Sequence, residues 1–363
     1  MSIIDNKKCL KTLTLINLFM TSTNFKVSAP GKIILMGEHY VVYGAPAVAF
    51  AVDRYNYITF EELDGEDRFE LFNDAKYGNA VLSPDGNYES EKPFMKMFMP
   101  IYLRVYNKAK EMGKHLKPLK GTWSSDGAMK GMGASASYSA ALGFGLYHTI
   151  GITPEEDELF ECAQLGVVVA HGGRPSGVDA KTIASGQGIK FSKQFNPVKL
   201  NFEKIKIEFP EGTGLLVVDT FKGERDNTGE LVHKFAENHG AGKPGDMTDE
   251  QRKKIYDNYL AVYDNILQEL NKNGDPEKLG KLLLENHALL KNGGVSTQDI
   301  EQVIKVAMDN GALGAKLTGA GGLGGAVIVY AYEKDFDNIQ KLLKDAGYNN
   351  LSLHPALHSI QLE

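Results

Sequence analysis

A glycine-rich stretch at residues 126–139 could bind an anion. It reads Asp-Gly-Ala-Met-Lys-Gly-Met-Gly-Ala-Ser-Ala-Ser-Tyr-Ser, and the small residues that follow, up to Phe144, are typical of a buried helix. Glycine lets several backbone N–H groups point toward one anion, and a helix that begins there adds the positive end of its dipole. This chemistry suits a polyphosphate. The alternative is a plain glycine-rich turn before a buried helix of small residues.

The stretch matches neither of two common nucleotide-binding patterns. No Gly-Lys-Ser/Thr closes it, so it is not a Walker A loop, and Gly131-Met132-Gly133 lacks the third glycine of a dinucleotide fingerprint. Three other turns stand out along the chain. They are Ser-Ala-Pro-Gly-Lys…Gly-Glu-His at 28–39, Pro-Ser-Gly-Val-Asp at 175–179 and Lys-Leu-Thr-Gly-Ala-Gly-Gly-Leu-Gly-Gly at 316–325.

Length and composition set limits on what the protein can be. A chain of 363 residues is long enough for two domains with cores of their own, and 42% hydrophobic with 24% charged residues is ordinary for a soluble globular protein. A formal net charge of -6 argues against general binding of nucleic acid or anionic membranes. Cys9 and Cys162 form no metal-spaced pair, so we expect no disulfide framework and a reducing cytoplasm.

The first residues resemble a secretory leader only weakly. The apolar run from Leu10 to Met20 is short, is broken by Lys11 and Asn17, and is followed by no small-residue cleavage site. It is also too short to span a bilayer. We therefore expect residues 1–24 to be a disordered extension, with Met20 as the true start, and no transmembrane segment elsewhere.

Periodicity and turn residues predict an alternation of strands and helices. We expect a strand, a Pro30-Gly31 turn and a second strand at the start, then β structure through 41–52 with a turn at Asp53-Arg54. Residues 64–92 should form a loop or lid. Strands are expected at 55–62, 188–191, 215–220 and 325–332, and helices at 95–112, 154–170, 249–271, 276–291, 298–310 and 335–346.

The four turns together resemble those of the GHMP kinases, most closely the mevalonate kinases. The segments Asp219-Thr220…Arg225-Asp226-Asn227-Thr228 and Asn292-Gly293-Gly294-Val295-Ser296 add to the likeness, which runs from about 25 to 363 in the family's order. The resemblance implies an α+β fold of two lobes, each a mainly antiparallel sheet backed by helices. The first, at 25–195, would be a ribosomal S5 domain 2-like ATP-binding lobe. The second, at 196–363, would be ferredoxin-like.

The resemblance assigns the catalytic pair to Asp179 and Lys32. Phosphoryl transfer requires a bound triphosphate, a neutralising cation and a group that orients or deprotonates the acceptor hydroxyl. Asp179 would be that group, and the Lys32 ammonium would keep it ionised and offset charge on the transferred phosphoryl group. The structural alternatives are an Asx-turn carboxylate for Asp179 and a solvated turn lysine for Lys32.

The resemblance also assigns the ligands ATP and Mg²⁺. The nucleotide would be held by Lys130, Gly131, Met132, Gly133, Ala134, Ser135 and Ala136. Ser135 corresponds to the family's magnesium-ligand serine; alternatively it is an N-cap whose hydroxyl bonds the first helical N–H groups.

The acceptor would contact five residues: Glu38, His39, Tyr138, Thr228 and Ala320. His39, with backbone N–H groups, could receive the acceptor's carboxylate. For His39 the structural alternative is a histidine at the edge of the core that is hydrogen-bonded to backbone.

Two departures from the family pattern concern the metal and the substrate. Mevalonate kinases carry a magnesium-binding glutamate about eleven residues before the catalytic aspartate, but residues 166–170 contain no acid, and Glu161 lies roughly 10 Å from Val168 along a helix. The metal would then rely on Ser135, the nucleotide phosphates and Asp179. Arg174 could recognise an extra phosphate on the substrate, with Arg225 as a second candidate, or it could point to solvent.

The function implied is ATP-dependent phosphorylation of the C5 hydroxyl of mevalonate in isoprenoid precursor synthesis. One alternative is a kinase of a phosphorylated mevalonate, the 3-phosphate or the 5-phosphate. Another is a non-catalytic metabolite-binding relative, because a fold does not fix a function. The expected partner is a small hydroxy acid, with no nucleic acid and no membrane, in the cytoplasm. A homodimer is kept as an expectation.

Overall fold

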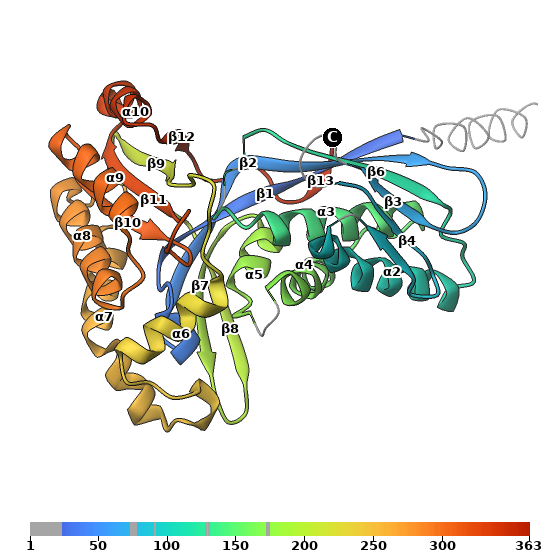
Figure 1. Ribbon diagram of the computed structural model, residues 1–363, viewed down its shortest axis with the longest axis horizontal. Coiled ribbons are helices and arrows are strands. Elements are labelled where there is room, and N and C mark those ends of the chain that lie inside the picture. The colour runs from blue at the N-terminus through green and yellow to red at the C-terminus, as the bar shows by residue number, and fades with distance from the viewer. Residues whose placement is uncertain (1–23, 73–77, 91, 128, 130, 172–174) are drawn as a thin grey trace, which may run out of the picture.

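The computed structural model describes residues 24–363, apart from 73–77, 91, 128, 130 and 172–174. In the part that it describes, the chain forms two sheets, each covered by helices (Figure 1). Helices α2–α5 lie on one face of the larger sheet, and α8, α9 and α10 pack against the smaller one. This is the mixed α+β architecture of two lobes that the sequence predicts, and that prediction is confirmed. The expected extension at residues 1–24 lies almost wholly outside the described residues.

The larger sheet has nine strands among the described residues, in the order β13-β1-β2-β6-β3-β4-β5, with the ribbon β7–β8 joined to β2. Neighbouring strands are antiparallel except for the parallel pair β3 and β6. The strands are β1 (Asn24–Met36), β2 (Ala47–Glu62), β3 (Phe69–Phe72), β4 (Ala80–Leu82), β5 (Tyr88–Ser90), β6 (Leu119–Ser125), β7 (Gly188–Gln194), β8 (Lys199–Ile205) and β13 (Gln361–Leu362).

The smaller sheet is fully antiparallel, in the order β10-β11-β9-β12. Its strands are β9 (Thr213–Asp219), β10 (Gly314–Thr318), β11 (Ala326–Tyr332) and β12 (Asn349–Leu353). The helices of the whole described chain are η1 (Tyr40–Tyr43), η2 (Pro93–Phe98), α2 (Met99–Glu111), α3 (Ala134–Thr149), α4 (Glu156–His171), α5 (Val178–Ser185), α6 (Thr228–Asn238), η3 (Pro244–Asp246), α7 (Asp249–Glu269), α8 (Pro276–Asn292), α9 (Gln298–Asp309), η4 (Glu333–Asp335) and α10 (Phe336–Asp345).

The long periodic segments fold as predicted, within a few residues at their ends. The predicted strand over 41–44 is wrong, because residues 41–43 belong to η1 and Gly44 is its C-cap in the left-handed conformation (φ 94°). The predicted loop over 64–92 is partly wrong, because β3, β4 and β5 form within it. These strands are only three or four residues long, too short for alternation to reveal them.

The two predicted turns near the start of the chain, at Pro30-Gly31 and Asp53-Arg54, are the two sides of one β-bulge instead. Pro30 pairs with Tyr55 and the next residue, Gly31, pairs with Val52. The two residues between them on β2, Asp53 and Arg54, therefore have no pairing partner on β1. An irregularity of this kind bends and twists both strands, and it also accommodates a proline that cannot donate to the ladder. Strands β1 and β2 therefore continue through it.

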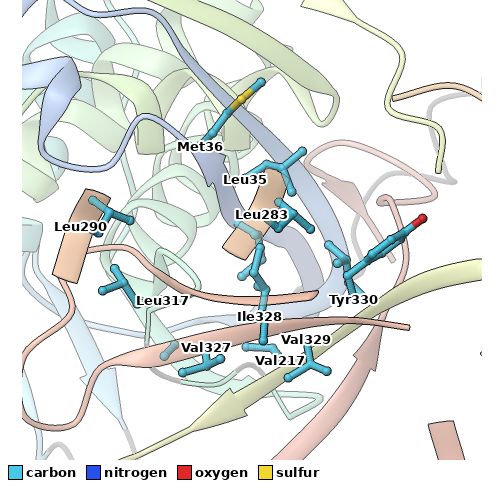
Figure 2. Packing of buried hydrophobic residues seen from close by; sticks show 14 of the residues in the cluster. Leu35, Met36, Val217, Leu283, Leu290, Leu317, Val327, Ile328, Val329 and Tyr330 are labelled. Atoms are coloured by element: carbon cyan, nitrogen blue, oxygen red, sulfur yellow. The ribbon is translucent and has the colours of Figure 1, made fainter. Parts of the chain in front are cut away.

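The far end of β1 enters the core of the second lobe. Leu35 and Met36 are fully buried and belong to one apolar cluster with β9, β11 and α8. Figure 2 shows Leu35 and Met36 together with Leu283 of α8 and Ile328 of β11. This packing fixes the residues that follow β1 against the second lobe.

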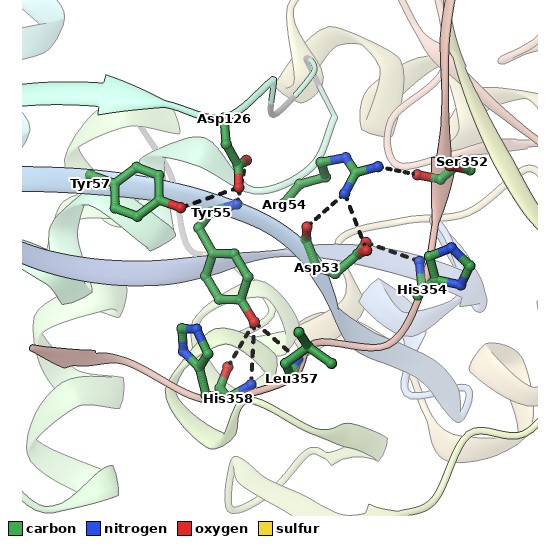
Figure 3. A network of polar contacts seen from close by, with 9 residues as sticks. All are labelled: Asp53, Arg54, Tyr55, Tyr57, Asp126, Ser352, His354, Leu357 and His358. Atoms are coloured by element: carbon green, nitrogen blue, oxygen red, sulfur yellow. Dashed lines mark hydrogen bonds and ion pairs between the residues drawn. The ribbon is translucent and has the colours of Figure 1, made fainter. Parts of the chain in front are cut away.

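The C-terminal segment returns to the first lobe, where β13 pairs with β1. Before it arrives there, the chain is held against the bulge of β2 by the polar network of Figure 3. Arg54 Nη2 donates to the Ser352 carbonyl (2.7 Å), and the Tyr55 hydroxyl accepts from the backbone N–H groups of Leu357 (3.0 Å) and His358 (3.2 Å). The segment thus ties the two lobes together.

The predicted division of the chain at residue 195 would cut the hairpin between β7 and β8, in which Gln194 pairs with Lys199. Because β7, β8 and β13 all belong to the larger sheet, the first lobe continues through β8 and also includes β13 from the C-terminal end. Two lobes with these amended limits remain our proposal. No helix of the described ranges is long and apolar enough to cross a membrane.

Candidate active site

Lys32 and Asp179 form an ion pair. Lys32 lies in the middle of β1, and its Nζ is 3.0 Å from Asp179 Oδ1. Asp179 is the second residue of α5, whose N-cap Gly177 has a φ of 97°. The lysine side chain is 3% exposed and the carboxylate 29% exposed, so the carboxylate alone is open to a ligand. The interpretation of Lys32 as a solvated turn lysine is therefore wrong. In the part of the chain that the structure describes, the Asp179 carboxylate pairs with Lys32 instead of making an Asx turn.

The second glycine-rich loop holds Lys32 from its other side. The backbone N–H of Lys32 donates to the Met132 carbonyl (2.9 Å), and its Nζ donates to the Gly131 carbonyl (3.3 Å). Gly133 has a φ of 75°, and a Cβ there would lie 2.9 Å from Lys32 Cγ and 3.0 Å from Lys32 Cε. A side chain at this position would therefore collide with the lysine.

Helix α3 begins directly after Gly133, which is its N-cap. Ala134 is exposed, Ser135 is half-buried and Ala136 is buried, so the helix presents its first turn to a ligand. Ser135 is the second residue of the helix, and the interpretation of Ser135 as an N-cap is wrong. The predicted contact Lys130 lies outside the described residues.

Glu38 and Lys316 form a fully buried ion pair across the two lobes. Glu38 follows the end of β1, and Lys316 is the central residue of β10; Lys316 Nζ lies 2.5 Å from Glu38 Oε1 and donates to the Leu317 carbonyl (2.8 Å). Both side chains have zero exposure. Burial raises the pKa of Glu38 above its usual value, and the Lys316 ammonium opposes that rise. Burial likewise lowers the pKa of Lys316, against the effect of the carboxylate.

His39 bridges the same two lobes. Its Nε2 lies 2.9 Å from the Ala320 carbonyl, so Nε2 carries the proton, and the ring stacks on Phe235 at 5.0 Å. Burial lowers the pKa of His39 to about 4, which keeps the imidazole neutral. Its Nδ1 is then a buried acceptor without a hydrogen-bond partner in the described chain. The prediction that His39 could receive a carboxylate is therefore wrong, because its one N–H is already bonded.

Tyr138 and Thr228 lie apart from these contacts. Tyr138 is buried on α3, where its hydroxyl donates to the Ser124 carbonyl (3.0 Å) and its ring packs edge-on against Trp123. Thr228 is the half-buried first residue of α6, whose N-cap Asn227 accepts from the Gly229 N–H. The roles predicted for both residues stay predictions.

A preformed metal site is absent from the described part of the chain. No group of three or more histidine, cysteine, aspartate or glutamate side chains is placed to hold an ion there. Glu161 is paired with Arg104 of α2, so it does not replace the missing glutamate. Of the two arginines considered for an extra phosphate, Arg174 lies outside the described residues and Arg225 is exposed on the loop after β9.

Sequence reasoning gave Lys316 no role. The signal available was its position within Gly314–Thr318, where the other residues are small, apolar or threonine. A lysine in such a buried strand requires a partner of opposite charge. The partner, 278 positions earlier in the chain, could not be read from spacing.

Comparison with known proteins indicates which class of protein this chain belongs to, first through a family model and then through solved structures. Residues 266–349 match the family model described as GHMP kinases C terminal. Among solved structures, that of L. major mevalonate kinase in complex with R-mevalonate is 25% identical, with a TM-score of 0.71 over 92% of this chain and 96% of that one. The Methanococcus jannaschii mevalonate kinase structure, 24% identical with a TM-score of 0.70 over 92% and 99%, shows the same fold. The fold is thus that of a GHMP kinase, an ATP-dependent small-molecule kinase.

Curated relatives narrow the class further. The mevalonate kinase of Thermococcus sibiricus is 32% identical over 339 residues, which span 88% of this chain and 92% of that protein. That of Thermococcus onnurineus is 30% identical over 85% and 89% of the two chains. The chain belongs to the mevalonate kinase family.

Proposed function

We propose that the protein transfers the terminal phosphoryl group of ATP to the C5 hydroxyl of mevalonate. The observation that carries this proposal is the contact of Lys32 with Asp179 (3.0 Å) beside the carbonyl of Gly131 (3.3 Å). A cation there can offset charge on the transferred group while a carboxylate orients or deprotonates the acceptor hydroxyl. Membership of the mevalonate kinase family supports the choice of acceptor.

The nucleotide phosphates would lie against residues 131–136. The loop before α3 is glycine-rich, and the start of this 16-residue helix offers backbone N–H groups that lack intrahelical acceptors, together with the positive end of the dipole. Both features favour an anion. Lys130 is kept as a further phosphate contact.

We assign Mg²⁺ as the accompanying cation. The oxygen ligands that we assign to it are the half-buried Ser135 hydroxyl and the partly exposed Asp179 carboxylate. This set fits a cation that arrives with the nucleotide and keeps phosphate oxygens and water as its other ligands, as Mg²⁺ prefers. When bound, it would neutralise charge on the phosphates.

The acceptor would lie between Asp179 and the residues that follow β1. Glu38 Oε2 and His39 Nδ1 are buried acceptors without protein partners in the described chain. Hydroxyl groups of a hydroxy acid can donate to such atoms, so leaving them unpaired would cost about 1–3 kcal/mol each. Ala320, bonded to His39, would line the same pocket, and we keep Tyr138 and Thr228 as further contacts.

Two wider properties follow as proposals. We place the protein in the cytoplasm, which agrees with the buried, unpaired Cys162 thiol and with the use of ATP. A homodimer stays an expectation, to be checked by light scattering.

The experiment that tests this function is a comparison of acceptors. Purified protein with ATP and Mg²⁺ is assayed against mevalonate, its 3-phosphate and its 5-phosphate, and the product is identified by NMR. We expect mevalonate 5-phosphate from mevalonate, with the highest kcat/KM of the three. Preference for either phosphate would show a kinase of phosphorylated mevalonate, and turnover of none would show a non-catalytic relative.

A further inference from the structure

Lys316 occupies a position at which an apolar residue would be expected. It lies at the centre of β10, opposite Ile328 of β11, and all five residues of the strand are buried. Its ammonium reaches out of the second lobe to Glu38 Oε1 (2.5 Å) of the first. The reaction as described above does not use this lysine.

Stability alone does not account for the pair. Two charges taken out of water lose hydration worth several kcal/mol each, so a buried ion pair is often no more stable than well-packed apolar residues of similar volume. The pair does, however, leave one oxygen of Glu38 unpaired, since Oε2 has no hydrogen-bond partner among the described residues. Lys316 therefore fixes one carboxylate oxygen, while the other is equally buried and has no hydrogen-bond partner among the described residues.

We propose that Lys316 is a positioning residue for the phosphoryl acceptor: it holds the Glu38 carboxylate in place across the lobes so that Oε2 accepts a hydrogen bond from an acceptor hydroxyl. This rests on the proposed function, in which Glu38 contacts the acceptor. Among the described residues, Lys316 Nζ bonds to the Glu38 carboxylate and the Leu317 carbonyl, whereas the Asp179 carboxylate pairs with Lys32.

The charges around the pair make the role of Lys316 measurable. Lys316 and, at longer range, Lys32 both favour the ionised form of Glu38. Two further titratable groups interact electrostatically with the pair: the Tyr259 hydroxyl with the Glu38 carboxylate, and His287 with the Lys316 ammonium. Without Lys316, the effect of burial would be less opposed, so the pKa of Glu38 would rise further and its protonated form would be favoured. Raising the pH would restore the carboxylate.

The test is the pH dependence of KM in Lys316→Met. At pH 7 we expect the KM for mevalonate to rise at least about tenfold, and to fall back toward the wild-type value as the pH approaches 9.5. The KM for ATP should change less than about twofold. Lys305→Met, which removes a lysine from an exposed i,i+4 pair with Asp309, is the control and should show neither effect.

Three outcomes would overturn the proposal: an unchanged KM for mevalonate, a rise in KM that is equal at every pH, or an equal rise in the KM for ATP. The first means that the pair is not needed for acceptor binding, and the other two mean a general structural role. Wild-type turnover in the same assay tests the proposed function separately, because a wild type inactive on mevalonate would refute that function before any variant is compared.

A second variant keeps the test decisive if Lys316→Met does not fold. Glu38→Gln combined with Lys316→Met removes both charges, so no unpaired buried charge remains. We expect this double variant to fold and to have a raised KM for mevalonate that does not change between pH 6 and pH 9.5. A double variant with the wild-type KM would overturn the proposal.

Discussion

Replacing Gly133 with alanine should separate the backbone role of this glycine from its contact with Lys32. The added Cβ would lie 2.9 Å from Lys32 Cγ and 3.0 Å from Lys32 Cε, whereas carbon atoms normally approach to about 3.5–4.0 Å. The lysine must then move by about half an ångström, away from a 3.0 Å contact with Asp179. Because a misplacement of about 1 Å can cost 100-fold, we expect kcat to fall about tenfold or more.

The same substitution also has a cost in stability. Gly133 has a φ of 75°, and a residue with a Cβ loses about 1–2 kcal/mol in that conformation. Gly113 is the matched control, since its φ is 64° and no atom would lie within 4 Å of a Cβ added there. Gly113→Ala should therefore lose a similar free energy of unfolding and keep kcat within about twofold.

The assay combines steady-state kinetics on ATP and mevalonate with urea unfolding of both variants. Gly133→Ala should differ from Gly113→Ala in kcat far more than in unfolding free energy. If the two variants lose equal stability and Gly133→Ala keeps the wild-type kcat, the contact with Lys32 has no part in catalysis, and the glycine serves only to begin α3.

Three other predictions test the fold, the histidine and the metal. Tyr55→Phe leaves two backbone N–H groups of the C-terminal segment unpaired and should lower the free energy of unfolding by about 1–3 kcal/mol, measured by thermal unfolding. Tyr57→Phe, which removes an exposed hydrogen bond to Asp126, should cost less than half as much. Folding lowers the pKa of His39 from 6.5 to about 4, so between these pH values the unfolded chain binds one proton more than the folded protein. About 3 kcal/mol of unfolding free energy should therefore be lost as the pH falls through that window. His39→Asn should remove this part of the pH dependence in urea titrations, and His233→Asn, at an exposed position, should not. Ser135→Ala should raise the Mg²⁺ concentration for half-maximal rate, and calorimetry without nucleotide should detect no tight Mg²⁺ binding; tight binding would mean a metal site on the protein itself.

The parts of the site that sequence could predict depend on short-range backbone chemistry. The left-handed glycines at 133 and 177 each precede a helix, and such turns leave a clear local pattern. The resemblance then linked Lys32 to Asp179, and the structure brings these two side chains to 3.0 Å. Composition and spacing alone would not have joined them, because they come from distant segments.

The parts that sequence could not predict depend on contacts between the lobes. Glu38 meets Lys316 across 278 positions, and the pair forms only because β1 extends into the second core. The bulge opposite Pro30 has the same sequence signals as two turns, since proline and charged residues mark both features. The return of β13 to β1 rests on two paired residues, which is too little for any periodicity.

The central claim is that Asp179, held by Lys32, orients or deprotonates the acceptor hydroxyl. The most direct measurement is kcat for Asp179→Asn at saturating ATP, Mg²⁺ and mevalonate, with nucleotide affinity measured alongside. We predict a fall of roughly 10²–10⁴-fold in kcat with nearly unchanged nucleotide affinity, and a less than additive further loss when Lys32→Met is combined with it. Wild-type turnover by the folded Asp179→Asn variant would contradict the account.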